Sequence, residues 1–164
     1  MLEFNYSERL ESLIHNLDWH IQLPPDWVNF FEESGTCSSM ASDERNNSRM
    51  RIRTRAVLRW ETSLPSVPRG PEPVGVYIKD FSRRGCGLIS PIQFYPEETV
   101  RILLATFWIR LKVVRVRRVG PSCYEIGLKL IEQNQPGPEA FAVCTGTATH
   151  ESVTDVAGLP SNSP

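Results

Sequence analysis

The stretch VGVYIKDFSRRGCGLIS, from Val74 to Ser90, decides how this chain is expected to fold. Apolar residues dominate both ends of the stretch, and a polar segment that ends in glycine, Asp80 to Gly85, separates them. This pattern predicts two short strands joined by a turn. The turn also carries ligand-binding chemistry: a carboxylate at Asp80, a hydroxyl at Ser82, and at Gly85 a residue that permits positive φ and close approach of a ligand to the backbone. The alternative is a plain turn that Asp80 caps and Gly85 closes.

Alternating apolar residues on both sides of this stretch predict further strands. Upstream, residues 55–61 alternate with period two; downstream, the same pattern covers residues 99–105, 107–119 and 124–130. The alternation slips at Val113-Val114, where we expect a bulge. Several short strands at this spacing, with turn residues between them, predict a mainly β domain, either a closed antiparallel barrel or a sandwich.

The rest of the chain divides around this β domain, which we place at residues 48–132. Residues 1–35 are expected to be helical, with one amphipathic helix capped by Asn5 or Ser7 and a second short helix around Trp27 to Phe31. The remaining segments are a flexible linker at residues 36–47 and a short helix followed by a disordered tail at residues 133–164.

Charge is strongly segregated along the chain, although the net charge is only −1. Residues 45–129 hold fourteen arginines and three lysines against six acidic residues, whereas residues 1–44 hold nine acidic residues and one arginine. Such a basic segment predicts an anionic partner, with a simple solubility balance as the alternative. The acidic N-terminal segment is expected to fold against the basic domain when no ligand is bound.

The sequence argues against a membrane protein, a metal-binding protein and an enzyme. There is no apolar run long enough to span a bilayer and no basic, apolar leader, so we expect a cytoplasmic protein that does not bind membranes. The four cysteines are irregularly spaced and only three histidines occur, which predicts free thiols and no metal site. No nucleophile–base pair or phosphate-binding loop is evident, so we expect no catalytic residue, no cofactor and no enzymatic activity.

A run of arginines precedes the first predicted strand: Arg49, Arg51, Arg53 and Arg55. A guanidinium can fork onto a phosphate or stack on a flat base, and it satisfies the O6 and N7 acceptors of guanine together. Asp80 offers the opposite chemistry, an acceptor for the N1–H and N2–H donors of guanine. A ligand with two guanines and two phosphates would suit this set of residues.

Together the arginines and the turn resemble the two-part pattern of PilZ domains, R-x-x-x-R followed by [D/N]-x-S-x-x-G. Arg49 and Arg53 match the first part, and Asp80, Ser82 and Gly85 match the second. The resemblance implies a six-stranded antiparallel β-barrel with an adjoining helix. It also implies that these five residues bind the bacterial second messenger cyclic di-GMP.

The resemblance extends over residues 47–132 and includes the glycine-containing closing strand, residues 124–130. The register of the arginine pair stays open, because Arg51 and Arg55 are also four residues apart; these two are secondary candidates. A second basic cluster lies on the long predicted strand, where charge at an exposed edge is the first interpretation and a phosphate site the alternative. Its members are Arg115, Arg117 and Arg118.

The sequence therefore predicts a cyclic di-GMP receptor that changes conformation on binding and signals to an unidentified partner protein. We expect residues 36–54 to be mobile without ligand and to close over the bound nucleotide, which would reposition residues 1–44. Two other functions remain open. One is a basic barrel that binds single-stranded nucleic acid, and the other is a PilZ-like adaptor that recognises a protein and no nucleotide.

Overall fold

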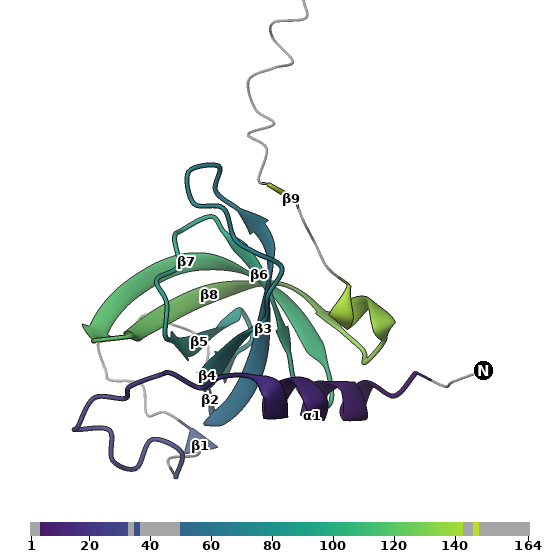
Figure 1. Cartoon of the computed structure of the whole chain (residues 1–164). Helices are drawn as coiled ribbons and strands as arrows, with labels where there is room; N and C mark the ends of the chain where they lie inside the picture. Colours follow the sequence, from purple (N-terminus) through teal and green to yellow (C-terminus); the bar gives the residue numbers. More distant parts are fainter. Residues whose placement is uncertain (1–3, 33–34, 37–49, 143–145, 148–164) are drawn as a thin grey trace, which may run out of the picture.

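The computed structural model describes residues 4–32, 35–36, 50–142 and 146–147, and its centre is a closed, six-stranded antiparallel β-barrel (Figure 1). The barrel strands are β3 (Thr54–Ser63), β4 (Val74–Ser82), β5 (Gly85–Ser90), β6 (Thr99–Leu103), β7 (Trp108–Gly120) and β8 (Cys123–Asn134). They pair in the order β3–β4–β5–β8–β7–β6, and β6 pairs back onto β3 to close the barrel. The predicted fold class is therefore confirmed.

Short elements surround the barrel. They are the helix α1 (Tyr6–Asn16), the 3-10 helix η1 (Pro138–Phe141) and the two-residue strands β1 (Gly35–Thr36), β2 (Met50–Arg51) and β9 (Gly146–Thr147). Strand β2 pairs with β1 on one side and with β4 on the other, where Met50 lies opposite Phe81. The arginine-rich stretch thus runs beside the strand that carries Asp80.

The β4–β5 hairpin differs from the sequence prediction in one respect that concerns function. Strand β4 continues through Ser82, and the connection to β5 consists only of Arg83 and Arg84. Pairing continues to the end, with Asp80 opposite Gly87 and Ser82 opposite Gly85. Asp80 and Ser82 are therefore held by a strand rather than by a loop.

The barrel interior holds the largest of the three apolar clusters among the described residues. Alternate residues of each strand point inward, as the period-two pattern predicts; on β3 these are Ala56, Leu58 and Trp60. The bulge expected at Val113-Val114 is confirmed, because Val113 lies opposite Leu128 while Arg115 lies opposite Gly127.

Helix α1 packs across one outer face of the barrel (Figure 1). Asn5 is its N-cap and accepts a hydrogen bond from the backbone N–H of Glu8. Of the two caps considered in the sequence, Asn5 is therefore the one the structure uses. The hydroxyl of Tyr6 donates to the carbonyl of Leu104 at 2.6 Å. Tyr6 and Leu10 bury their side chains against β3, β6, β7 and η1; the outer cluster contains Val57, Leu103, Trp108, Ala140 and Phe141.

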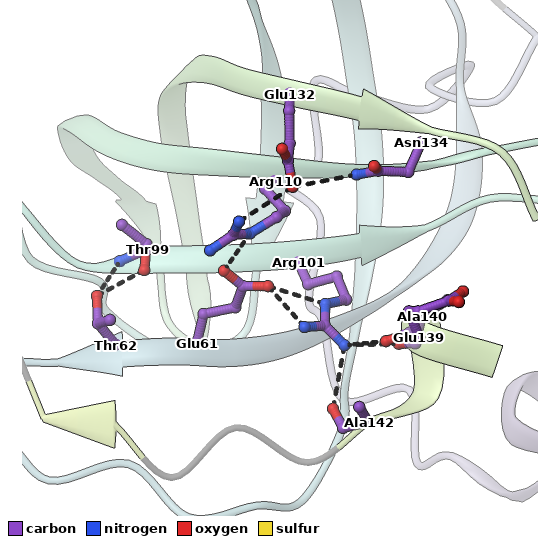
Figure 2. A network of polar contacts seen from close by, with 10 residues as sticks. All are labelled: Glu61, Thr62, Thr99, Arg101, Arg110, Glu132, Asn134, Glu139, Ala140 and Ala142. Carbon is purple, nitrogen blue, oxygen red and sulfur yellow. Dashed lines mark hydrogen bonds and ion pairs between the residues drawn. The ribbon is translucent and has the colours of Figure 1, made fainter. Parts of the chain in front are cut away.

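A polar network holds the same face together (Figure 2). Glu61 is buried and accepts from Arg101 on one carboxylate oxygen and from Arg110 on the other, at 2.8–2.9 Å and 2.6 Å. Arg110 also pairs with Glu132. Arg101 continues outward and donates to three backbone carbonyls at the end of η1, those of residues 139, 140 and 142. The network ties the C-terminal segment to four barrel strands, β3, β6, β7 and β8.

A second outer cluster is aromatic and covers β4 and β5. Trp19 stacks on Tyr77 with ring centroids 5.8 Å apart and an interplanar angle of 7°, and Phe30 is buried beside them. The predicted short helix around Trp27 to Phe31 is wrong: this segment forms successive turns, such as the one closed by the Phe30 amide and the Trp27 carbonyl. Its aromatic residues pack onto the outer face of β4 and β5, and that packing outweighs the local helical pattern.

Some predictions concern segments that the structure does not describe. The flexible linker at residues 36–47 lies outside the described residues apart from Thr36, and the disordered tail lies outside them from residue 148 onward. Among the helices in the described ranges, none has the length and apolar character needed to cross a bilayer.

Candidate ligand-binding site

A pocket of about 420 Å³ lies on the outer surface of four neighbouring strands, β4, β5, β8 and β7. Three residues singled out in the sequence line it together: Asp80, Ser82 and Gly85. The remaining lining residues come from the hairpin turn and from the long β7–β8 pair: Arg84, Cys86, Gly87, Val114, Arg115, Glu125, Ile126, Gly127, Leu128 and Lys129. The fold thus brings the turn motif together with Arg115, one member of the second basic cluster.

The side chains of Asp80 and Ser82 are oriented by local hydrogen bonds. Asp80 is 7 % exposed, and its Oδ1 accepts from the backbone N–H of Gly87 at 3.1 Å. The Ser82 hydroxyl donates to the carbonyl of Gly85 and accepts from the N–H of Arg84, both at 3.4 Å. The turn-closing role considered for this motif is therefore present, and both side chains still line the pocket.

Gly85 serves a different purpose from the one expected. It does not adopt a positive φ. A Cβ atom at this position would lie 1.9 Å from the carbonyl oxygen of Leu128 on the neighbouring strand. Gly85 is required because β5 and β8 approach closely here, and the freedom to adopt a positive φ, one of the two properties noted in the sequence, is not used.

The arginine run is only partly described. Arg49 lies outside the described residues, and Arg51 is described for its backbone alone, in β2. The guanidinium of Arg53 lies over the ring of Phe30, 4.3 Å from its centroid, and that of Arg55 lies over Trp19 at 5.0 Å. Neither is among the residues that line the pocket. Both contact the aromatic N-terminal segment, so the structure does not bring Arg53 together with Asp80.

Within the described ranges, six basic side chains of the barrel are paired with carboxylates. Those in ion pairs are Arg69, Lys79, Arg101, Arg110, Lys112 and Arg117. By contrast, among the described residues the side chains of Arg83, Arg84, Arg115 and Lys129 make no ion pair or hydrogen bond. Three of these four cations line the pocket. The unpaired positive charge of the barrel therefore gathers where Asp80 and Ser82 lie.

Strand β7 is not an edge of the sheet, since it pairs with β6 on one side and β8 on the other. The first interpretation of the cluster Arg115, Arg117 and Arg118, as charge that protects an exposed edge, is wrong. The three arginines also differ from one another. Arg117 pairs with Glu125 and Arg118 donates to the carbonyl of Gly120, whereas Arg115 faces the pocket.

Of the two described acidic residues that line the pocket, Asp80 and Glu125, the second is ion-paired with cations outside the pocket lining. Burial tends to raise the pKa of the Glu125 carboxyl, but hydrogen bonds from Lys79 and Arg117 outweigh burial and hold this pKa below its ordinary value. Glu125 is therefore ionised and balanced by two cations, and it does not cancel the charge of Arg84, Arg115 and Lys129. The pocket can attract an anion.

Cys86 also lines the pocket but is not suited to act as a nucleophile. Burial raises the pKa of its thiol well above the ordinary value, and the charge of Asp80 raises this pKa further. The thiol consequently stays protonated, and nucleophilic reactivity belongs to the thiolate.

Sequence reasoning did not assign a binding role to several lining residues, among them Gly87, Gly127 and Lys129. A signal was present for the glycines, since glycine weakens the interior of a strand and often marks a place where another group approaches closely. The two glycines lie directly opposite each other in β5 and β8.

Comparison with known families gives one match. The family model described as PilZ domain matches residues 43–140, which is more than half of the chain and includes the whole barrel. No protein in the curated set matches the chain.

Proposed function

The chain belongs to the PilZ domain family, and from that premise we propose that it is a receptor for cyclic di-GMP that signals to a partner protein. PilZ domains generally bind this dinucleotide and are not typically enzymes. The observation that carries the proposal is the convergence of Asp80 and Ser82 with unpaired cations in one pocket. A guanine nucleotide needs both an acceptor for its N–H groups and positive charge for its phosphates.

Each part of the pocket has a role in the proposed complex. The Asp80 carboxylate accepts from N1–H and N2–H of a guanine, and Ser82 supplies a hydroxyl beside it. Arg84 and Lys129 lie on the same wall and attract the phosphates. Buried acceptors of this kind give strong discrimination, because a base without the matching donors leaves them unsatisfied.

In the proposed complex the arginine run moves to the pocket and completes the site. In the described structure Arg53 stacks on Phe30, and a guanidinium that stacks on a phenyl ring can stack on a guanine in the same manner. We expect that Arg53 leaves the ring of Phe30 and stacks on a guanine when the ligand binds, and that Arg49 moves to the pocket together with it. Since Phe30 belongs to the N-terminal segment, this exchange would change how that segment packs on the barrel. That change is the proposed output to the partner protein.

Binding of single-stranded nucleic acid is less well supported. A nucleic-acid groove requires a long track of available cations, but six basic side chains of the barrel are already in ion pairs. The three unpaired cations that line a single pocket suit a compact anion better than a strand. The salt dependence of binding separates the two, since it is steep for a long strand.

Calorimetric titration of the full chain with cyclic di-GMP tests the proposal, with GTP as the control ligand. We expect saturable binding of cyclic di-GMP and much weaker binding of GTP, which offers one guanine and a different spacing of phosphates. Absence of binding at high concentrations of cyclic di-GMP would leave the adaptor function as the better account.

A further inference from the structure

Four residues form a row across the floor of the pocket. Asp80 on β4 lies opposite Gly87 on β5, Gly87 lies opposite Gly127 on β8, and Gly127 lies opposite Arg115 on β7. Residues that lie opposite one another in neighbouring strands present their side chains on the same face. The row therefore has a carboxylate at one end, a guanidinium at the other, and no side chain between them.

Both end residues lean inward over the glycines. A Cβ atom on Gly87 would meet Asp80 Oδ1 at 3.0 Å, and one on Gly127 would meet the Nε atom of Arg115 at 3.6 Å. The four strands span three interstrand spacings, about 14 Å. Between these two side chains Gly87 and Gly127 add no side chain of their own, so the face of a flat base can approach the backbone there.

A bulge is what aims Arg115 at this floor. If the pairing continued from Val113 and Leu128 without a bulge, Val114 would lie opposite Gly127 and Arg115 opposite Ile126, whose side chain is in the barrel core. The bulge moves Arg115 to the outer face, and re-aiming of a side chain is a recurrent use of bulges near binding sites. Among the described residues no acceptor holds the Arg115 guanidinium in place.

We propose that Arg115 is a specificity-determining residue, which reads the O6 and N7 edge of a guanine that lies flat on Gly87 and Gly127. Asp80 reads the N1–H and N2–H edge of the same base from the opposite end of the row. This inference rests on the proposed function, and it extends the site beyond the two-part pattern that the sequence displays. Arginine is the residue best suited to O6 and N7, because its two parallel donors match the two acceptors.

Titration of three variants with two ligands tests the role of Arg115. The variants are Arg115→Ala, Arg115→Lys and the matched control Arg118→Ala, which removes the same charge from the same strand at a residue that does not line the pocket. The ligands are cyclic di-GMP and cyclic di-IMP, whose base keeps O6 and N7 but lacks the N2 amine.

We expect Arg115→Ala to weaken both ligands by the same factor, roughly 10- to 100-fold, while Arg118→Ala leaves affinity unchanged. Arg115→Lys should show most of this loss, because lysine keeps the charge but lacks the fork. The ratio of the affinities for cyclic di-GMP and cyclic di-IMP should be the same in the variants as in the unaltered chain, because only Asp80 contacts the N2 amine. Equal effects of Arg115→Ala and Arg118→Ala, full affinity in Arg115→Lys, or a changed ratio would each overturn the proposal.

A second pair of variants tests the glycine floor. A Cβ atom on Gly127 would make ordinary contacts, 3.5 Å from Arg115 Cβ, so Gly127→Ala is expected to fold. Its methyl group would stand where the base lies, and cyclic di-GMP binding should fall at least about tenfold. Gly120→Ala, in the same β7–β8 hairpin, is the control with affinity unchanged. Full affinity in Gly127→Ala would exclude a base lying on the floor.

These outcomes are distinct from failure of the proposed function. If the unaltered chain does not bind cyclic di-GMP, both proposals fail together. If the unaltered chain binds it and Arg115→Ala behaves like Arg118→Ala, the receptor function stands and only the role of Arg115 is lost.

Discussion

Two outer faces of the barrel use the same residue type in opposite ways. On the face covered by α1 and η1, Arg101 is 6 % exposed and fully engaged, with Glu61 on one side and backbone carbonyls on the other (Figure 2). On the face of the pocket, Arg115 is exposed and makes no ion pair or hydrogen bond within the described residues. Arg101 therefore links elements of the fold, whereas the donors of the Arg115 guanidinium remain available to a ligand.

The difference lies in the neighbours that each strand register supplies. Glu61 on β3 lies between Arg101 and Arg110, and each of its two carboxylate oxygens receives one arginine. Arg115 lies opposite a glycine, so the register gives it no acceptor. The number of arginines in a sequence therefore says little about function until the cross-strand neighbour of each one is known.

The largest effect on binding is expected from the arginine run. Replacing Arg49 and Arg53 together by alanine removes two charge-assisted contacts, each worth on the order of 1.5–3 kcal/mol, so cyclic di-GMP binding should be abolished. Circular dichroism should still report the intact barrel, because both residues precede its first strand, β3. Unchanged affinity in this double variant would favour the alternative register, Arg51 and Arg55.

The largest effect on stability is expected from the opposite face. Glu61→Gln removes the charge that Arg101 needs in its buried position, and loss of one partner of a buried ion pair costs about 3–5 kcal/mol. Urea denaturation should show this loss, while cyclic di-GMP affinity of the folded fraction stays unchanged. The exposed Glu132→Gln provides the control and should leave the denaturation midpoint nearly unaltered. A loss of affinity in Glu61→Gln would mean that the two faces are coupled.

Asp80→Ala should have an intermediate effect, about 1.5–3 kcal/mol of binding free energy for a hydrogen-bonded charge. It removes an acceptor and not a cation, so guanine recognition should suffer more than phosphate recognition. Competition between cyclic di-GMP and cyclic di-AMP measures this selectivity. If affinity falls while selectivity is unaltered, Asp80 only shapes the hairpin through its bond to the Gly87 amide.

Tyr6→Phe should have the smallest effect, on stability alone. It removes one buried hydrogen bond, from the Tyr6 hydroxyl to the Leu104 carbonyl, with a net cost of about 1 kcal/mol. Thermal unfolding is the measurement, and cyclic di-GMP affinity should be identical to that of the unaltered chain. A change in affinity would show that docking of α1 influences the pocket across the barrel.

Much of the barrel could be predicted from the sequence because period-two alternation records which face of each strand is buried. The strands around Ala56 to Trp60, the hairpin at Asp80 and the bulge at Val114 were all visible in this way. The turns around Trp27 to Phe31 were not, because their shape depends on an aromatic surface that only the assembled sheet provides.

The site was predictable as a set of residues but not as an arrangement. Asp80 and Ser82 could be identified by their spacing from Gly85, yet the steric need for that glycine comes from Leu128, more than forty residues later. The row from Asp80 to Arg115 depends on three strand registers at once. Such non-local pairing is absent from local sequence patterns.

Hydrogen exchange with and without saturating cyclic di-GMP tests the division between the two faces most directly. We predict increased protection at residues 50–54, 80–87 and 114–129, together with changed exchange in residues 19–31 as Arg53 leaves Phe30. Residues 6–16 in α1 and residues 99–111 in β6 and the first part of β7 should exchange at the same rates in both states. Equal protection of the pocket strands with and without nucleotide, or protection confined to the α1 face, would contradict the account.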